Sequence, residues 1–191
     1  MAPGGRRDSL GRGARERIIA AAAELFARQG FNATSINELR AAARVSKRTL
    51  YQHFESKDEL IVAYLAAYAR RGPAEAVLLR EDLAPRARLL EVFTALAAPG
   101  TVLPDPIVAA TAEFPDPAHP VHRAAAAHAQ RFGSHLVALC REAGADNPDR
   151  AARRLVTLYD GACCRLLLED TAVVIEDAYQ LGVAVLRDAI D

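Results

Sequence analysis

The 191-residue sequence has no tryptophan and a single methionine, and only 6% of its residues are aromatic. Alanine, leucine and arginine outnumber valine, isoleucine and threonine, which is typical of helices rather than of a sheet. Because 51% of the residues are hydrophobic, the chain can still bury a core, and a disordered protein is excluded. The composition therefore predicts an all-α fold.

Cysteines and long apolar runs are also scarce. The three cysteines, Cys140, Cys163 and Cys164, have no Cys-x-x-Cys spacing, which favours reduced thiols in the cytoplasm. The most apolar stretch, residues 18–27, contains Glu24 and is too short to cross a bilayer. No apolar segment follows the arginine pair near the N-terminus, where an export signal would need one. We therefore expect a soluble, cytoplasmic protein without membrane contact.

The formal net charge is zero, yet the charges are unevenly distributed. Residues 1–48 carry ten Lys and Arg against four Asp and Glu, a net of +6, so the rest of the chain carries fourteen against twenty, a net of −6. A basic head is thus joined to an acidic body. This asymmetry disfavours a protein that coats long DNA, because the body would repel phosphates.

Capping signals and apolar periodicity divide the chain into three parts. Residues 1–13 lack periodicity and are expected to be a flexible arm. Residues 14–60 contain a helix that ends at Gly30 and two short helices capped by Ser35 and Ser46. Residues 61–191 form the body, which a fourth helix from Ser56 to about Arg71 joins to the head. Further helices are expected at about 74–80, 86–98, 106–113, 118–143, 149–169 and 171–190. No strand pattern exceeds an ambiguous run at 173–175.

The two short helices have the pattern of a helix-turn-helix. Their inward positions are apolar, whereas the third helix presents an almost unbroken polar outer face. A short surface helix can be polar without any function. However, Lys47 and Arg48 lie in its first turn, where the helix dipole disfavours cations unless phosphates compensate. This placement favours a helix that enters the major groove of DNA.

At these residues the sequence resembles the TetR family. The family pattern Gly-Phe-x-x-Thr stands at residues 30–34, and Val-Ser-x-x-Thr-Leu-Tyr-x-His-Phe-x-x-Lys-x-x-Leu stands at residues 45–60. The resemblance spans about residues 15–61. It implies an N-terminal three-helix helix-turn-helix domain and a C-terminal helical domain for effector binding and dimerisation. It further implies a transcriptional repressor that binds a palindromic operator on double-stranded DNA as a homodimer and is released by a small-molecule effector.

The resemblance also implies roles for single residues in the head. Phosphate contacts would come from Thr34, Tyr51, His53 and Lys57, and base contacts from Lys47, Arg48, Thr49 and Gln52. The full DNA-binding set is Thr34, Ser35, Arg44, Ser46, Lys47, Arg48, Thr49, Tyr51, Gln52, His53 and Lys57. His53 fits a packed helix-end residue equally well. Arg44 stands where the family usually has Gly, so a left-handed backbone there would cost on the order of 1 kcal/mol.

The body carries no comparably specific motif. An effector pocket under the fourth helix would be lined by Tyr64, Tyr68, Phe93, Phe114, Phe132, Tyr159 and Cys163, each of which is individually better explained as a core side chain. The resemblance implies that the last two helices of each subunit form a four-helix bundle with the partner. Their apolar faces would serve equally well as ordinary core.

Other functions have less support in the sequence. Metal ligation by His119, His122, His128 and His135 is disfavoured, because their spacing matches no zinc motif, so solvated or capping roles are favoured and no cofactor is expected. An enzyme is disfavoured because the sequence has no Gly-rich phosphate loop, nucleophile elbow or His-Glu-x-x-His. Cys163-Cys164 would suit a thiol sensor, although a small buried side chain is favoured. A sequence-tolerant DNA binder and a metal- or redox-responsive regulator of the same fold stay open.

Overall fold

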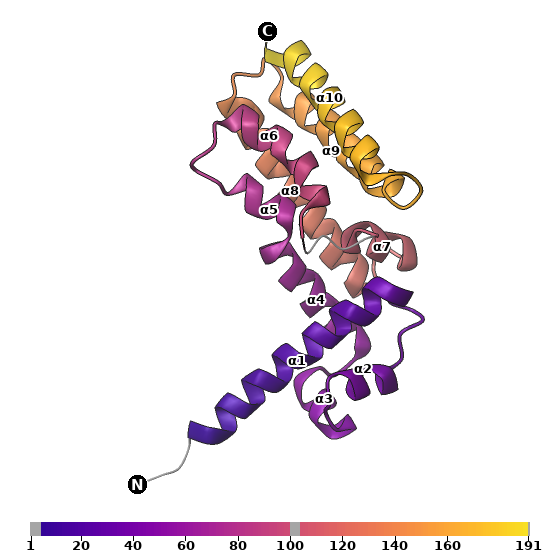
Figure 1. The fold of residues 1–191 in the computed structure, drawn as a ribbon. Helices are drawn as coiled ribbons and strands as arrows, with labels where there is room; N and C mark the ends of the chain where they lie inside the picture. The colour runs from indigo at the N-terminus through magenta and orange to yellow at the C-terminus, as the bar shows by residue number, and fades with distance from the viewer. Residues whose placement is uncertain (1–4, 100–103, 191) are drawn as a thin grey trace.

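The structure is a computed structural model that describes residues 5–99 and 104–190, with side chains from residue 13 onward. Helices and their connections make up this part of the chain, which contains no strand. Figure 1 shows a small helical head at one end and a larger helical body at the other, with a helix that runs between them. The predicted all-α fold with an N-terminal helix-turn-helix is confirmed. None of the described helices is long and apolar enough to span a bilayer.

The head consists of α1 (Gly5–Gln29), α2 (Ile36–Ala42) and α3 (Lys47–His53), and α4 (Lys57–Arg71) leads into the body. The predicted caps at Ser35, Ser46 and Ser56 all accept a hydrogen bond from a backbone N–H of the following helix. The first helix begins nine residues before the expected Ala14, so the absence of apolar periodicity was the wrong guide to its start. Residues 1–4 of the expected arm lie outside the described residues.

The body contains α5 (Pro73–Leu78), α6 (Pro85–Thr94) with a 3₁₀ turn at Ala95–Ala97, α7 (Pro106–Glu113), α8 (Pro120–Glu142), α9 (Pro148–Arg165) and α10 (Thr171–Ile190). These bounds agree with the expected helices to within a few residues, and the run at 173–175 is helical. Five of the six helices begin with proline, whose missing N–H needs no partner in a first turn.

The described side chains form two apolar cores. One fills the body between α5, α6, α8, α9 and α10. The other lies under the head, where Phe26, Phe31 and Tyr64 pack against one another with ring centroids 4.9–6.1 Å apart. This second core also contains Ile107 and Phe114 of the α7 segment. The head therefore completes its core with residues that are distant in the sequence.

Gly182 marks a close approach of α10 to α6, and it supports a stability prediction. A Cβ atom at this position would lie 2.8 Å from Phe93 Cε2, and Phe93 is fully buried. We expect Gly182→Ala to lower the free energy of unfolding by about 1 kcal/mol, because overpacking costs about 1–3 kcal/mol and the gain in helix propensity offsets part of it. Urea denaturation measures the change.

Gly133→Ala on α8 is the matched control, because a Cβ there would meet no atom within 4 Å. This variant is expected to be as stable as the parent or more stable by up to about 1 kcal/mol. Equal stability changes in the two variants would contradict the close packing at Gly182.

Candidate nucleic-acid interface, cavity and groove

Local contacts fix both the start of α2 and the turn between α2 and α3. The Ser35 hydroxyl and amide bind Glu38 in a capping box and hold the pKa of its carboxyl at about 2. Arg44 follows α2 with φ = 53°, so it adopts the left-handed backbone that the family's usual glycine at this position would favour. Ser46 then caps α3 by accepting from Thr49 N at 3.0 Å. The turn therefore sets the angle of α3 through its own residues.

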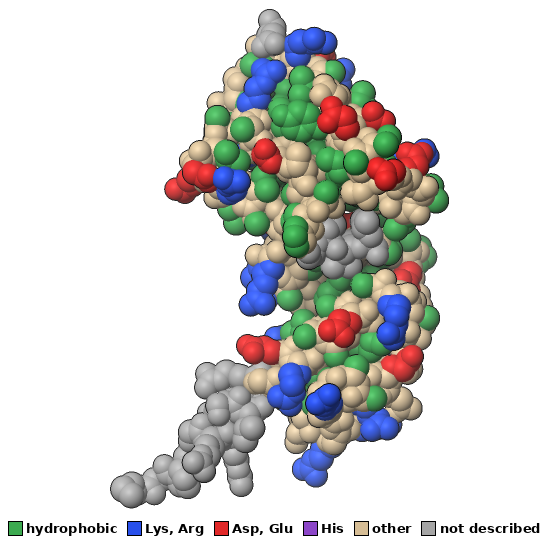
Figure 2. All heavy atoms as spheres, in the orientation of Figure 1, with side chains coloured by type: hydrophobic (Ala, Val, Ile, Leu, Met, Phe, Trp, Pro, Cys, Tyr) green, Lys and Arg blue, Asp and Glu red, His purple; other side chains and the backbone are tan. Residues whose placement is uncertain are grey.

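The outer face of α3 is open to solvent. Leu50 is fully buried beneath it, whereas Lys47, Arg48 and Gln52 are exposed and Tyr51 is 42% exposed. The Lys47 ammonium lies 5.9 Å from the centroid of the Tyr51 ring. Arg44, Ser35 and Ser46 are also exposed around this face. Lys and Arg side chains gather at the same end of the molecule (Figure 2), so the face is positively charged.

Two predicted phosphate contacts have other roles in the structure. The Thr34 side chain is fully buried, and its hydroxyl donates to Gly30 O at 2.7 Å. Lys57 is only half-exposed, because its ammonium donates to the carbonyls of Phe31, Asn32 and Thr34 at 3.0–3.3 Å. These groups stabilise the turn between α1 and α2, and the phosphate contacts of Thr34 and Lys57 stay predictions. Thr49 and His53 are half-buried, and their predicted DNA contacts stay predictions.

A carboxylate of the body holds the same turn from the other side. The Glu113 side chain at the end of α7 accepts from Phe31 N at 2.9 Å and from Asn32 N at 2.7 Å. Gly30 has φ = +80°, a backbone conformation that favours glycine, and a Cβ atom there would lie 2.8 Å from a Glu113 carboxylate oxygen, which would have to shift. The position of the head is thereby coupled to α7.

A small cavity of about 60 Å³ lies in the body below α4. Three of the seven predicted effector residues line it, namely Tyr68, Phe132 and Tyr159. Tyr64 and Phe114 instead belong to the core under the head, and Phe93 is fully buried in the body core. Cys163 is buried beside Tyr159 but outside the lining. For these four residues the structure favours the packing role over the predicted effector contact.

The polar lining of the cavity was not predicted from the sequence. Its charged and ionisable members include Glu75, Asp105, His128 and Asp160. Tyr68 donates to Asp105 Oδ2 at 2.7 Å, and the other oxygen of Asp105 caps α7 through the amides of residues 107 and 108. An Asp before a proline is a helix-start signal, which would have identified Asp105 as a cap but not as part of the cavity lining.

The histidines and cysteines occupy separate environments. His119 caps α8 and stacks on Phe114 with centroids 4.7 Å apart, which confirms the predicted capping role for this residue. His128 Nε2 lies 2.8 Å from Glu75 Oε1. Within the described residues no group of three or more His, Cys, Asp and Glu side chains gathers as a metal site.

Burial raises the pKa of the Cys163 thiol, which disfavours the reactive thiolate, while Cys164 is exposed.

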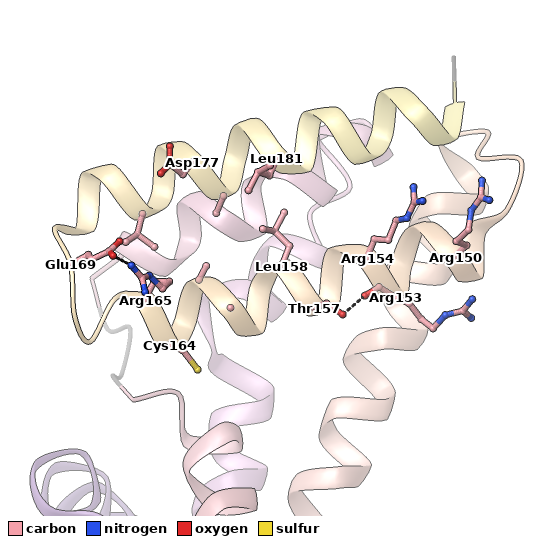
Figure 3. A pocket seen from close by; sticks show the side chains of 14 residues that line it. Arg150, Arg153, Arg154, Thr157, Leu158, Cys164, Arg165, Glu169, Asp177 and Leu181 are labelled. Atoms are coloured by element: carbon pink, nitrogen blue, oxygen red, sulfur yellow. Dashed lines mark hydrogen bonds and ion pairs between the residues drawn. The ribbon is translucent and has the colours of Figure 1, made fainter.

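A groove of about 1050 Å³ runs between α9 and α10 on the outside of the body (Figure 3). Its centre is apolar and contains Leu158 and Leu181, the latter 55% exposed. Arg150, Arg153 and Arg154 stand at one end, and the other end carries Glu169, Asp177 and Arg165, which pairs with Glu169. Arg154 is bound to Asp188 at 2.5 Å. The groove thus has a basic end, an apolar centre and a mixed end with two carboxylates.

Comparisons with known proteins agree with this architecture. Residues 18–64 match the model of the bacterial regulatory proteins, tetR family. An HTH-type transcriptional regulator of Mycobacterium tuberculosis is 30% identical over 142 residues, which cover 74% of this chain and 68% of that protein. The regulator YerO of Bacillus subtilis is 37% identical over 70 residues, which cover 37% of this chain and only 24% of that protein.

Solved structures extend the similarity to nearly the whole chain. The TetR-family regulator SCO4454 of Streptomyces coelicolor superposes with a TM-score of 0.84 at 34% identity, covering 94% of this chain and 97% of that one. A tetR-type regulator of Streptomyces avermitilis gives 0.78 at 32% identity, covering 92% and 97%. With its helix-turn-helix, its helical body and relatives that match along both, the chain belongs to the TetR family of DNA-binding transcriptional regulators.

Proposed function

We propose that this regulator is a ligand-responsive repressor that binds a palindromic operator as a homodimer and leaves it when a small molecule occupies the body. The exposed face of α3 is the observation that carries the proposal. Lys47 and Arg48 stand in its first turn, exposed, while Leu50 holds the helix to the head from beneath. Cations at that position are disfavoured by the helix dipole, and phosphate or base contacts would offset the cost.

In this proposal α3 enters the major groove of the operator. Arg48 reads a guanine edge, where its guanidinium can form two parallel hydrogen bonds, and Lys47 and Gln52 contact neighbouring bases. Arg44, Tyr51 and the amides at the start of α2 contact phosphates, which set the register without reading sequence. The bonds of Thr34 and Lys57 fit the same picture, because they fix the turn between α1 and α2 and so hold the helix-turn-helix on α1.

The groove between α9 and α10 supports the proposed homodimer. A two-fold axis perpendicular to the groove would cover its apolar centre with the same surface of a second copy. The same axis would bring the end with Arg150 and Arg153 to the partner's end with Glu169 and Asp177, so that charges of opposite sign meet. Dimerisation places two α3 helices side by side, which a palindromic operator requires.

The proposed effector site is the cavity below α4, and α7 offers a route from it to the head. Asp105 begins α7 at the cavity, and Glu113 ends it on the amides of Phe31 and Asn32. A ligand that prefers a displaced α7 would therefore favour heads that do not fit the operator. By linkage, the operator would weaken ligand binding by the same factor.

Selection from random duplex DNA tests the DNA-binding part of the proposal. We expect a palindrome with half-sites about one helical turn apart and an affinity that falls steeply with salt, as phosphate contacts release counterions. Equal affinity for selected and random duplexes at one salt concentration would instead support the sequence-tolerant binder. The absence of DNA binding at low salt would reject both.

The Arg48→Ala variant tests the assignment of α3. We expect operator affinity to fall about 10- to 100-fold, with discrimination relaxed at one base pair of each half-site. Arg141→Ala, on the exposed end of α8 in the body, is the matched control and should bind like the parent. Gel-shift titration on the selected operator gives both affinities. A uniform loss on all sequences would show a phosphate contact rather than a base contact.

A further inference from the structure

The cavity below α4 has a one-sided set of charges. Glu75 on α5, Asp105 before α7 and Asp160 on α9 contribute three carboxyl groups from three different elements. The only basic side chain among the described lining residues is the imidazole of His128. Without Lys or Arg in the lining, a carboxylate or phosphate ligand would meet uncompensated negative charge in a partly buried space.

The hydrogen bonds and the ion pair within the cavity add no further cationic side chain to its three carboxyl groups. Asp105 is 93% buried at the start of α7, where two amides and the Tyr68 hydroxyl donate to it. His128 is engaged by Glu75 at 2.8 Å. Asp160 is exposed in part to solvent on α9, but desolvation on the side that faces the cavity, followed by the charge of Asp105, raises the pKa of its carboxyl. A cation near Asp160 would relieve the repulsion between these two carboxyl groups.

The aromatic lining independently favours a positively charged ligand. Tyr68, Phe132 and Tyr159 line the cavity, and the rings of the last two lie 5.0 Å apart at an interplanar angle of 45°. Aromatic faces attract ammonium groups, most strongly where water is excluded. Both phenols stay neutral, because burial raises the pKa of Tyr68 and of Tyr159. The cavity thus combines carboxylates with aromatic rings, a pairing suited to an organic cation.

The remaining lining suits the hydrocarbon part of such a ligand. Ile107, Val108, Ala129 and Val156 are apolar. The volume of about 60 Å³ would hold roughly two to four water molecules, so it has room for an ammonium head and the first carbons of its chain. A bare metal ion fits less well, because no group of three or more potential metal ligands gathers among the described residues.

We propose that this cavity binds the ammonium head of an organic primary amine. Asp160 and Asp105 attract the charge, the aromatic rings enclose it, and the apolar side chains contact the hydrocarbon chain. This inference rests on the proposed function, since it gives a chemical class to the effector of the same site. It also connects the effector to the fold, because its ammonium group would contact Asp105, the residue that caps α7.

Isothermal titration calorimetry with three probes of equal length tests the charge preference. We expect saturable binding of n-butylammonium chloride, at least tenfold weaker binding of n-butanol, and no binding of sodium butyrate, all at one ionic strength. Equal binding of the alcohol or the butyrate would overturn the proposal, as would no binding of the amine. An equal heat from potassium chloride would assign the site to a bare cation and overturn it as well.

The variant Asp160→Asn tests the location of the site. Asp160 is exposed on α9, so its replacement should leave the fold intact, and we expect n-butylammonium to bind about tenfold more weakly. Glu81→Gln, an exposed carboxylate between α5 and α6, is the matched control and should bind the amine like the parent. Unchanged affinity in Asp160→Asn would place the amine elsewhere and overturn the assignment.

Operator binding without amine separates this inference from the proposed function. A protein that binds its selected palindrome but ignores all three probes would remain a regulator, and only the amine assignment would fail. A protein that binds the amine but no DNA would retain the cavity assignment and lose the proposed function. If both hold, the amine should lower operator affinity in the parent and less so in Asp160→Asn.

Discussion

Leu181→Asp is expected to convert the protein to monomers and to lower operator affinity at least 100-fold. Leu181 lies in the apolar centre of the groove and is 55% exposed in one chain, so the change should cost little in the isolated subunit. In the proposed dimer the same carboxylate would be buried without a partner. Loss of the second half-site then removes the avidity of two linked heads, which commonly amounts to 10²–10⁴.

Sedimentation velocity and gel-shift titration on the selected operator measure the two effects of Leu181→Asp. Leu79→Asp is the matched control, because Leu79 is 68% exposed at the end of α5 and does not line the groove. It should sediment and bind DNA like the parent. A Leu181→Asp protein that remains dimeric with parental operator affinity would contradict the proposed interface between α9 and α10.

Glu113→Ala is expected to weaken the attachment of the head to the body. The carboxylate accepts from the amides of Phe31 and Asn32, and hydrogen bonds to charged groups contribute about 1.5–3 kcal/mol each. Because one of the two amides is exposed to water, we expect a total loss of about 2 kcal/mol in the free energy of unfolding. Urea denaturation measures that loss, and hydrogen exchange should rise at both amides.

Glu142→Ala provides the control for Glu113→Ala, since Glu142 is exposed at the end of α8. It should change the free energy of unfolding by no more than about 0.5 kcal/mol. Unaltered hydrogen exchange at Phe31 and Asn32 in the Glu113→Ala protein would contradict a structural role for this contact. Faster exchange together with weaker operator binding would support the coupling of α7 to the head.

The head was predictable because its signals are local. Ser35 and Ser46 determine helix starts through bonds to residues three positions away, and both caps are in the structure. The left-handed Arg44 followed from the turn in which it stands. The outward face of α3 followed from one buried leucine and its polar neighbours. Such features depend on contacts between residues that are close in the sequence, so a sequence pattern predicts them directly.

The cavity was only partly predictable because its residues meet through long-range packing. Selecting aromatic side chains identified Tyr68, Phe132 and Tyr159 but could not tell them from Tyr64, which faces the other core from the same helix. The carboxyl groups come from three elements whose relative positions the sequence does not record. The hydrogen bonds of Lys57 were not predictable for a similar reason, since its acceptors lie 23–26 residues away.

The core under the head has a consequence for exchanging parts between related regulators. Ile107 and Phe114 contribute to that core, and Glu113 supplies acceptors for two of its turn amides. A chimaera that grafts residues 14–60 onto a foreign body would bring neither the apolar side chains nor the carboxylate with it. The transplantable unit is therefore discontinuous in sequence, and a working hybrid would have to carry the whole of α7 and Phe114 along with the head.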